Sequence, residues 1–198
     1  MTGVVDYGAG NLKSVCNALT YLGAAFEIVA DSGRLAACDR VILPGVGAFP
    51  SAMEKLERTG FVEPLRRAAE DKPLLGICLG MQLLFEKGFE FRETGGLGLL
   101  PGYVDRIPDT GLPIPHVGWN GLEPGIGSPL LAGVAPGAAC YFVHSYMAFT
   151  AADYVAASAD YGLSVPALVQ RGHIFGAQFH PEKSSRVGLR ILSNFLAL

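Results

Sequence analysis

One stretch decides the fold: Pro73 to Glu86, which reads PLLGICLGMQLLFE. Within it, Cys78 has one glycine two residues before it and another two residues after it, among apolar residues. We interpret residues 73–77 as a buried strand and residues 79–86 as the helix that follows. Small flanking residues let the backbone bend sharply between the two and leave the sulfur accessible, as a nucleophile requires. Free cysteine is also among the most often buried residue types, so a core role for Cys78 is the alternative.

The composition fits one domain with a substantial core, because the chain has 198 residues, of which 50% are hydrophobic and 17% charged. No apolar run approaches the ~20 residues that cross a bilayer, so we expect no membrane partner. The net charge of −3 predicts no nucleic-acid partner. The four cysteines are far apart, without a CxxC pair, and no secretory signal is visible. We therefore expect no metal, no disulfide framework and a cytoplasmic location.

Strand and helix signals alternate through the first half of the chain. The expected strands are 3–7, 26–30, 40–43 and 73–77, and the expected helices are 11–22, 53–65 with a break at Gly60, and 79–86. Such alternation predicts right-handed crossovers and a parallel sheet.

The second half of the chain has a different pattern. Residues 95–172 are rich in Gly and Pro, and short alternating segments at 141–144 and 154–157 predict antiparallel strands. A stripe of Val187, Ile191 and Phe195 predicts a closing helix. We predict an α/β fold in one domain over residues 1–198: a mainly parallel central sheet flanked by helices, with an antiparallel extension.

A thiolate nucleophile needs a base, and the base needs an acceptor that orients it. His180 fits this pattern, because it ends the apolar segment 176–180 and Glu182 follows across a proline. Parallel sheets place ligands at the carboxyl ends of their strands. A histidine close to a glutamate also occurs often by chance on protein surfaces. This pair alone therefore does not decide between a catalytic pair and a chance neighbourhood.

The segments GICLGMQLLFE and FHPE together resemble the class I, triad-type glutamine amidotransferases, whose fold is flavodoxin-like. The resemblance implies that Cys78 is the nucleophile, His180 the general acid and base, and Glu182 the residue that orients it. It also places an oxyanion loop in LPGVGAF, residues 43–49. The N–H group of Gly47 in this loop and that of Leu79, next to Cys78, would bind the developing charge. Because glycines flank Val46, we expect this loop to flip a peptide plane between an inactive and an active conformation. The alternative is that the glycines only close a tight turn after the strand and that the loop is always active.

The same resemblance implies a set of substrate-binding residues: Gly45, Gln82, Glu86, His144, Ser145 and Tyr146. Gln82 and Glu86 would lie on successive turns of the helix behind Cys78, with an ordinary polar helix face as the alternative. For His144 the alternative is a strand histidine with satisfied hydrogen bonds.

Further segments point to one branch of that family. DYGAGNLKSV at 6–15, PHVGWN at 115–120, YFVHSY at 141–146 and HPEKSS at 180–185 resemble the glutaminase subunits of imidazole glycerol phosphate synthases. This resemblance implies hydrolysis of L-glutamine through a Cys78 thioester, without a cofactor. It also implies a heterodimer with a (β/α)8-barrel cyclase subunit that receives the ammonia.

The resemblance places five residues at the interface with that cyclase: Asn11, Trp119, Asn120, Tyr141 and Lys183. Trp119, the only tryptophan, stands in a Gly/Asn segment, and a core position is its alternative. Two other classes stay open at this point. A glutaminase that serves pyridoxal phosphate synthesis should lack PHVGWN and DYGAGN, and a cysteine sensor without enzymatic activity would not need His180 and Glu182 together.

Overall fold

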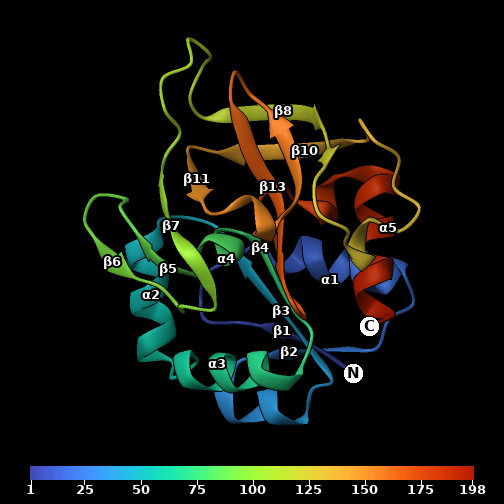
Figure 1. The fold of residues 1–198 in the computed structure, drawn as a ribbon. Coiled ribbons are helices and arrows are strands. Elements are labelled where there is room, and N and C mark those ends of the chain that lie inside the picture. The colour runs from blue at the N-terminus through green and yellow to red at the C-terminus, as the bar shows by residue number, and fades with distance from the viewer.

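The computed structural model describes residues 1–198, and an eight-stranded mixed sheet forms its centre (Figure 1). The strand order is β2-β1-β3-β4-β14-β13-β12-β9. The first five strands run parallel, and each of the last three runs antiparallel to its predecessor. The bounds are β1 Thr2–Val5, β2 Phe26–Val29, β3 Arg40–Gly45, β4 Leu74–Cys78, β14 Ile174–Ala177, β13 Ser164–Arg171, β12 Val155–Asp160 and β9 Glu123–Pro124.

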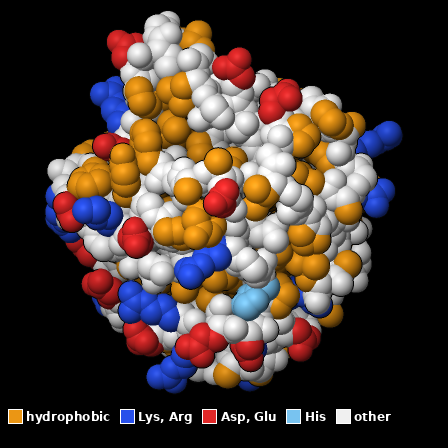
Figure 2. Space-filling view, viewed as in Figure 1, with side chains coloured by type: hydrophobic (Ala, Val, Ile, Leu, Met, Phe, Trp, Pro, Cys, Tyr) orange, Lys and Arg blue, Asp and Glu red, His pale blue; other side chains and the backbone are white.

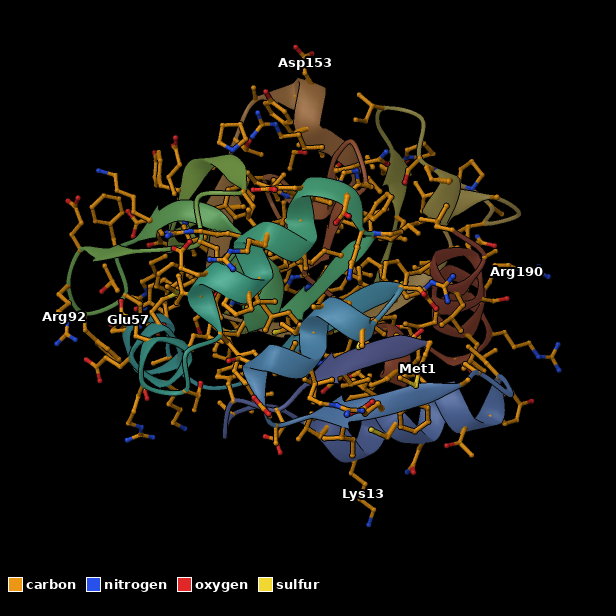
Figure 3. All side chains as sticks on the ribbon, turned by 90° about the horizontal axis from the view of Figure 1, so that it is seen from below. Met1, Lys13, Glu57, Arg92, Asp153 and Arg190 are labelled. Carbon is orange, nitrogen blue, oxygen red and sulfur yellow. The ribbon has the colours of Figure 1, made fainter.

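Helices cover both faces of this sheet, with α1 and α5 on one side and α2 and α3 on the other (Figure 1). Each helix buries an apolar stripe, and polar side chains such as Lys13 and Arg190 point away from the sheet (Figure 3). None of the helices combines the length and the apolar character that crossing a membrane requires. The bounds are α1 Leu12–Tyr21, α2 Phe49–Arg58, α3 Val62–Asp71 and α5 Ser185–Leu196.

Two smaller sheets lie outside the central one. One pairs β8 with β10, and the other has the order β11-β7-β5-β6. Their bounds are β8 His116–Gly121, β10 Ala139–His144, β5 Phe85–Gly88, β6 Thr94–Gly95, β7 Leu100–Arg106 and β11 Tyr146–Phe149. Four 3-10 helices complete the chain: η1 Ser32–Ala37, η2 Pro129–Leu131, η3 Ala152–Tyr154 and η4 Pro181–Lys183.

The structure confirms the predicted α/β class and corrects it in two places. The expected helix over 79–86 is wrong, because α4 covers only Leu79–Gln82 and β5 begins at Phe85. Residues 81–85 are all buried, and such a run fits a strand or a buried helix equally well; pairing of β5 with β7 decides for the strand. Segment 141–144 is antiparallel, but it pairs with β8 and does not join the central sheet.

Candidate active site

Cys78 is the last residue of β4, at the carboxyl end of the central parallel strands. Its backbone has φ 54° and ψ −111°, a conformation that residues other than glycine rarely adopt. Such strain, of about 1–3 kcal/mol, persists only where the surroundings impose it, and it is frequent at active sites. The bend lets the sulfur line a pocket although the residue is 7% exposed.

The two framing glycines make this bend possible, because the chain packs against itself too closely for a side chain. A Cβ atom on Gly76 would lie 2.5 Å from the carbonyl oxygen of Gly80. A Cβ atom on Gly80 would collide with the carbonyl oxygen of Leu43 in β3. The glycine pattern that identified Cys78 in the sequence therefore has a steric cause: β3, β4 and α4 meet at backbone contact distance.

His180 and Glu182 lie beside Cys78, because β14 is the parallel neighbour of β4 and Ala177 pairs with Ile77. The Nδ1 atom of His180 is 2.8 Å from Oε1 of Glu182, and their side chains are 4% and 1% exposed. His180 also lines the same pocket as Cys78. The structure thus brings together the three residues predicted to form the triad.

Two opposing effects set the pKa of His180. Burial lowers the pKa of this imidazole, but hydrogen bonds and charge interactions with Cys78 and Glu182 outweigh burial and raise the pKa to about 9. The ring is therefore protonated at neutral pH, which places a proton donor in the same pocket as the sulfur. The geometry suits a cysteine nucleophile with an adjacent proton donor.

A pocket of about 410 Å³ opens above the sulfur, within the range of small-molecule sites. Several of the predicted residues share this pocket, whose lining is Val46, Gly47, Cys78, Leu79, Gln82, Glu90, Pro115, Val143, His144, Ser145, Tyr146, His180 and Lys183. Gly47 has φ 103°, and the N–H groups of residues 46–48 donate to no backbone carbonyl. The N–H groups of this loop are therefore unused within the protein, and Val46 and Gly47 line the pocket.

Gln82 is held in the pocket wall by two hydrogen bonds. Its Nε2 atom donates to the carbonyl oxygen of Tyr146 and to Oε1 of Gln178, each at 3.0 Å. Both N–H bonds of the amide are thereby used, so Gln82 offers a ligand only its oxygen.

Glu86 does not lie where the sequence analysis placed it. It is in β5, exposed, and its Oε2 atom accepts a hydrogen bond from the Gly102 N–H at 3.0 Å. The expected position beside Gln82 required a second turn of α4, which does not form. Glu90 lines the pocket instead; its Oε2 accepts from the Phe49 N–H at 2.7 Å, and burial raises the pKa of its carboxyl. No local pattern in the sequence indicated Glu90.

His144 and His116 form a buried pair in register across β10 and β8. Nδ1 of His144 donates to the Tyr146 carbonyl at 2.8 Å, so its Nε2 accepts from Nδ1 of His116 at 3.0 Å. Burial lowers the pKa of His144 to about 4 and also lowers the pKa of His116, so both rings are neutral. Both ring nitrogens of His144 are used in these hydrogen bonds, and the residue lines the pocket. His144 therefore matches the alternative of a strand histidine whose hydrogen bonds are satisfied within the protein.

A narrow cavity lies behind the triad. Oε2 of Glu182 is buried without a hydrogen-bond partner, and Asn11 and Gly45 line the cavity beside it. Gly45 therefore lies under the triad and not in the wall of the larger pocket. Asn11 precedes α1, which contacts η4.

An apolar face borders the pocket on the β8–β10 ribbon. Trp119 is 56% exposed, which excludes the core position, and its ring meets the ring of Tyr141 edge-on at 5.9 Å. Val117 and Val143 are exposed on the same ribbon. Figure 2 shows hydrophobic side chains mainly in the upper half of the molecule and charged ones mainly in the lower half, around α3. We call Val117, Trp119, Tyr141 and Val143 the ribbon face.

Two of the remaining predicted interface residues, Lys183 and Asn120, differ in exposure and in hydrogen bonding. Lys183 is exposed at the rim of the pocket, next to the ribbon face. Asn120 is partly buried, and its Nδ2 donates to the carbonyl oxygen of Asp160 at 2.7 Å. Its amide thus anchors β8 to the end of β12. The four cysteines are free thiols, and no group of three or more His, Cys, Asp or Glu side chains could hold a metal ion.

Comparison with known proteins identifies the family to which this chain is similar. The family described as "Glutamine amidotransferase class-I" matches residues 3–198. The "Imidazole glycerol phosphate synthase subunit HisH" of Streptococcus sanguinis (strain SK36) is 52% identical over 194 residues, 97% of this chain and 93% of that protein. The protein of the same name from Shouchella clausii (strain KSM-K16) is 52% identical over 202 residues, 98% of this chain and 97% of that one.

Solved structures share the fold. "Structure of PurLQS from Thermotoga maritima" has a TM-score of 0.78 at 22% identity and covers 99% of this chain and 97% of that one. "Crystal structure of glutamine amidotransferase" has a TM-score of 0.77, also at 22% identity, with the same coverage.

Proposed function

The chain belongs to the class I glutamine amidotransferases, and we propose that it is the glutaminase subunit of an imidazole glycerol phosphate synthase. It hydrolyses L-glutamine to glutamate and supplies ammonia for L-histidine biosynthesis. The observation that carries the activity is the strained Cys78 in one pocket with His180, which is hydrogen-bonded to Glu182. The choice of synthase rests on relatives of that name at about 50% identity along nearly the whole chain.

The first half of the reaction is acyl transfer to sulfur. The Cys78 thiolate attacks the side-chain carbonyl carbon of glutamine, and the negative charge moves from sulfur to the carbonyl oxygen. The N–H groups of Leu79 and Gly47, at the edge of the same pocket, bind this oxyanion. His180 then gives its proton to the leaving nitrogen, the C–N bond breaks, and ammonia departs from a thioester.

Hydrolysis of the thioester reverses these roles. Neutral His180 takes a proton from water, the hydroxide adds to the carbonyl carbon, and the C–S bond breaks to release glutamate and the thiolate. Glu182 keeps the proton of Nδ1 in place and stabilises the imidazolium, so it orients the base without forming bonds. No cofactor takes part in this proposal.

The charged ends of glutamine find matching groups in the pocket. Glu90 supplies a partly buried carboxylate for the α-ammonium group, and Lys183 at the rim supplies a cation for the α-carboxylate. Oxygen Oε1 of Gln82 and the main chain of residues 144–146 complete the site.

The pH dependence of glutamine hydrolysis tests the proton donor. Because the pKa of His180 is raised to about 9, we expect the rate to fall as the pH rises through about 9, where the imidazolium is lost. Glu182→Gln removes a negative charge that raises this pKa, so the alkaline limb should move to lower pH and the maximal rate should fall. Steady-state rates between pH 6 and pH 10 measure both effects. An alkaline limb unchanged in Glu182→Gln would contradict the assignment.

A cyclase subunit is the proposed receiver of the ammonia, and the ribbon face with Lys183 is its proposed docking surface. A cyclase subunit must dock beside the pocket if ammonia is to pass to it without escaping into solvent. The exposed Trp119–Tyr141 pair beside the pocket supplies the aromatic anchor that such interfaces favour. A cytoplasmic location belongs to this proposal, in keeping with four free thiols.

Substituting Trp119 tests the docking surface. Trp119→Ala should weaken binding of the cyclase by about 2 kcal/mol, roughly 30-fold in Kd, because hot-spot aromatics have effects of this size. The melting temperature of the isolated subunit should change little, since the ring is 56% exposed. Tyr21→Ala is the matched control, because Tyr21 is 78% exposed at the far end of α1. Unchanged affinity together with a large fall in melting temperature would refute the assignment.

Comparing three states tests the proposed function and the loop switch together. We expect slow glutamine hydrolysis by the free subunit and a rate about 100- to 1000-fold higher in the complex with cyclase and acceptor nucleotide. Gaining one oxyanion donor accounts for this factor, and contact with the partner selects the loop conformer that supplies it. Equal rates in the free subunit, the complex and the complex with acceptor would rule out the switch. No hydrolysis in any state would rule out the function.

A further inference from the structure

The buried amide of Gln178 is next to the nucleophile, and none of the roles assigned above includes it. Gln178 is 0% exposed, and its Nε2 atom is 3.9 Å from the Cys78 sulfur, within the range of an N–H···S hydrogen bond. It follows β14, two residues before His180, where its own N–H donates to the Ala167 carbonyl at 2.9 Å.

The orientation of this amide is set by its neighbour. Oε1 of Gln178 accepts a hydrogen bond from Nε2 of Gln82 at 3.0 Å, and the same Gln82 nitrogen donates to the Tyr146 carbonyl at 3.0 Å. A flipped Gln178 amide would set two NH₂ groups against each other and leave a buried donor unpaired. The nitrogen of Gln178 therefore faces the sulfur.

We propose that Gln178 is a further catalytic residue, whose side-chain amide donates a hydrogen bond to the Cys78 thiolate. This inference rests on the proposed role of Cys78 as the nucleophile. Gln178 keeps its N–H throughout the reaction, whereas His180 gives its proton to the leaving nitrogen. When the thioester C–S bond breaks, the electron pair returns to sulfur, and the Gln178 N–H is already positioned to stabilise that charge without giving up a proton.

The test measures the reactivity of the sulfur directly. Full-length protein is treated with iodoacetamide at pH 7, and alkylation is followed by mass spectrometry of the Cys78 peptide, which separates Cys78 from the other three free thiols. Gln178→Met keeps the side-chain length and removes the donor. Loss of one hydrogen bond of ~1 kcal/mol lowers the thiolate fraction about fivefold but makes the remaining thiolate about twofold more nucleophilic, so alkylation should slow about two- to threefold. Gln170→Met on the adjacent β13 is the matched control and should react at the wild-type rate, because that amide bonds to the Gly172 carbonyl.

Alkylation needs no turnover of glutamine, so its outcome is separate from that of the proposed function. A second variant, Gln178→Asn, keeps a polar amide but withdraws it by one methylene and should also slow alkylation. Circular dichroism and melting curves establish which variants are folded. Wild-type alkylation rates in a folded Gln178→Met or Gln178→Asn protein would overturn the proposal and leave Gln178 a structural link between the sheet and α4.

Discussion

Replacing Cys78 by alanine is expected to reduce glutamine hydrolysis at least about 10⁴-fold, because no other group in the pocket can form the thioester. The same variant should still bind the cyclase subunit and support synthesis from added ammonium salts. Cys78 is 7% exposed and its side chain is small, so the loss of one sulfur atom leaves the ribbon face intact. The measurement is the rate of product formation in the complex, once with glutamine and once with ammonium chloride.

Cys16→Ala is the matched control for this substitution. Cys16 is a partly buried cysteine on α1, outside the pocket, so both activities should stay at the wild-type level. If Cys78→Ala also lost the ammonia-dependent reaction, the cysteine would be needed for the fold or for docking, and its assignment as the nucleophile would lose its support.

Gly80→Ala should disrupt the packing of β3 against α4 next to Cys78. The new Cβ atom would collide with the main-chain carbonyl of Leu43, so β3 or α4 must move. The loop of Gly47 follows β3 and α4 begins at Leu79, so either movement would displace a proposed oxyanion donor. We expect the free energy of unfolding to fall by about 3 kcal/mol, at the upper end of overpacking costs. For a chain of this size the melting temperature should fall by about 6–12 °C. Glutaminase activity should be lost even where the protein remains folded.

Gly95→Ala separates this steric effect from the general effect of replacing a glycine. Gly95 lies in β6, and a Cβ atom there meets nothing within 4 Å. Thermal melts and glutaminase rates of both variants make the comparison. A Gly80→Ala protein with wild-type stability would show that β3 and α4 adjust freely, contrary to the close packing described here.

Much of the site was predictable because it follows from local backbone geometry. The glycine spacing around Cys78 is the consequence of a strand, a bend and a helix packed at backbone distance, and such contacts exclude side chains whatever the rest of the chain does. His180 and Glu182 are close in sequence, so a short turn after β14 is enough to pair them.

Other assignments failed where a local pattern permits two structures. The apolar run after Gln82 suits a helix or a strand, and only pairing of Phe85 with Leu100 made it a strand. That pairing moved Glu86 to the surface and left Glu90, in the following loop, to line the pocket. No spacing rule connects Glu90 to Cys78, because they meet through the fold and not through one helix face.

The sequence by itself determined the parallel α/β core, the strained position of Cys78 and the pairing of His180 with Glu182, since each depends on residues that are neighbours along the chain or on the periodicity of single elements. Only the tertiary structure decided what surrounds the sulfur. Gln178 and Gln82 meet at 3.0 Å although 96 residues separate them, and His116 meets His144 through the register of β8 and β10. The physical reason is that hydrogen bonds between distant segments depend on which strands become neighbours, and burial of the whole core sets that order.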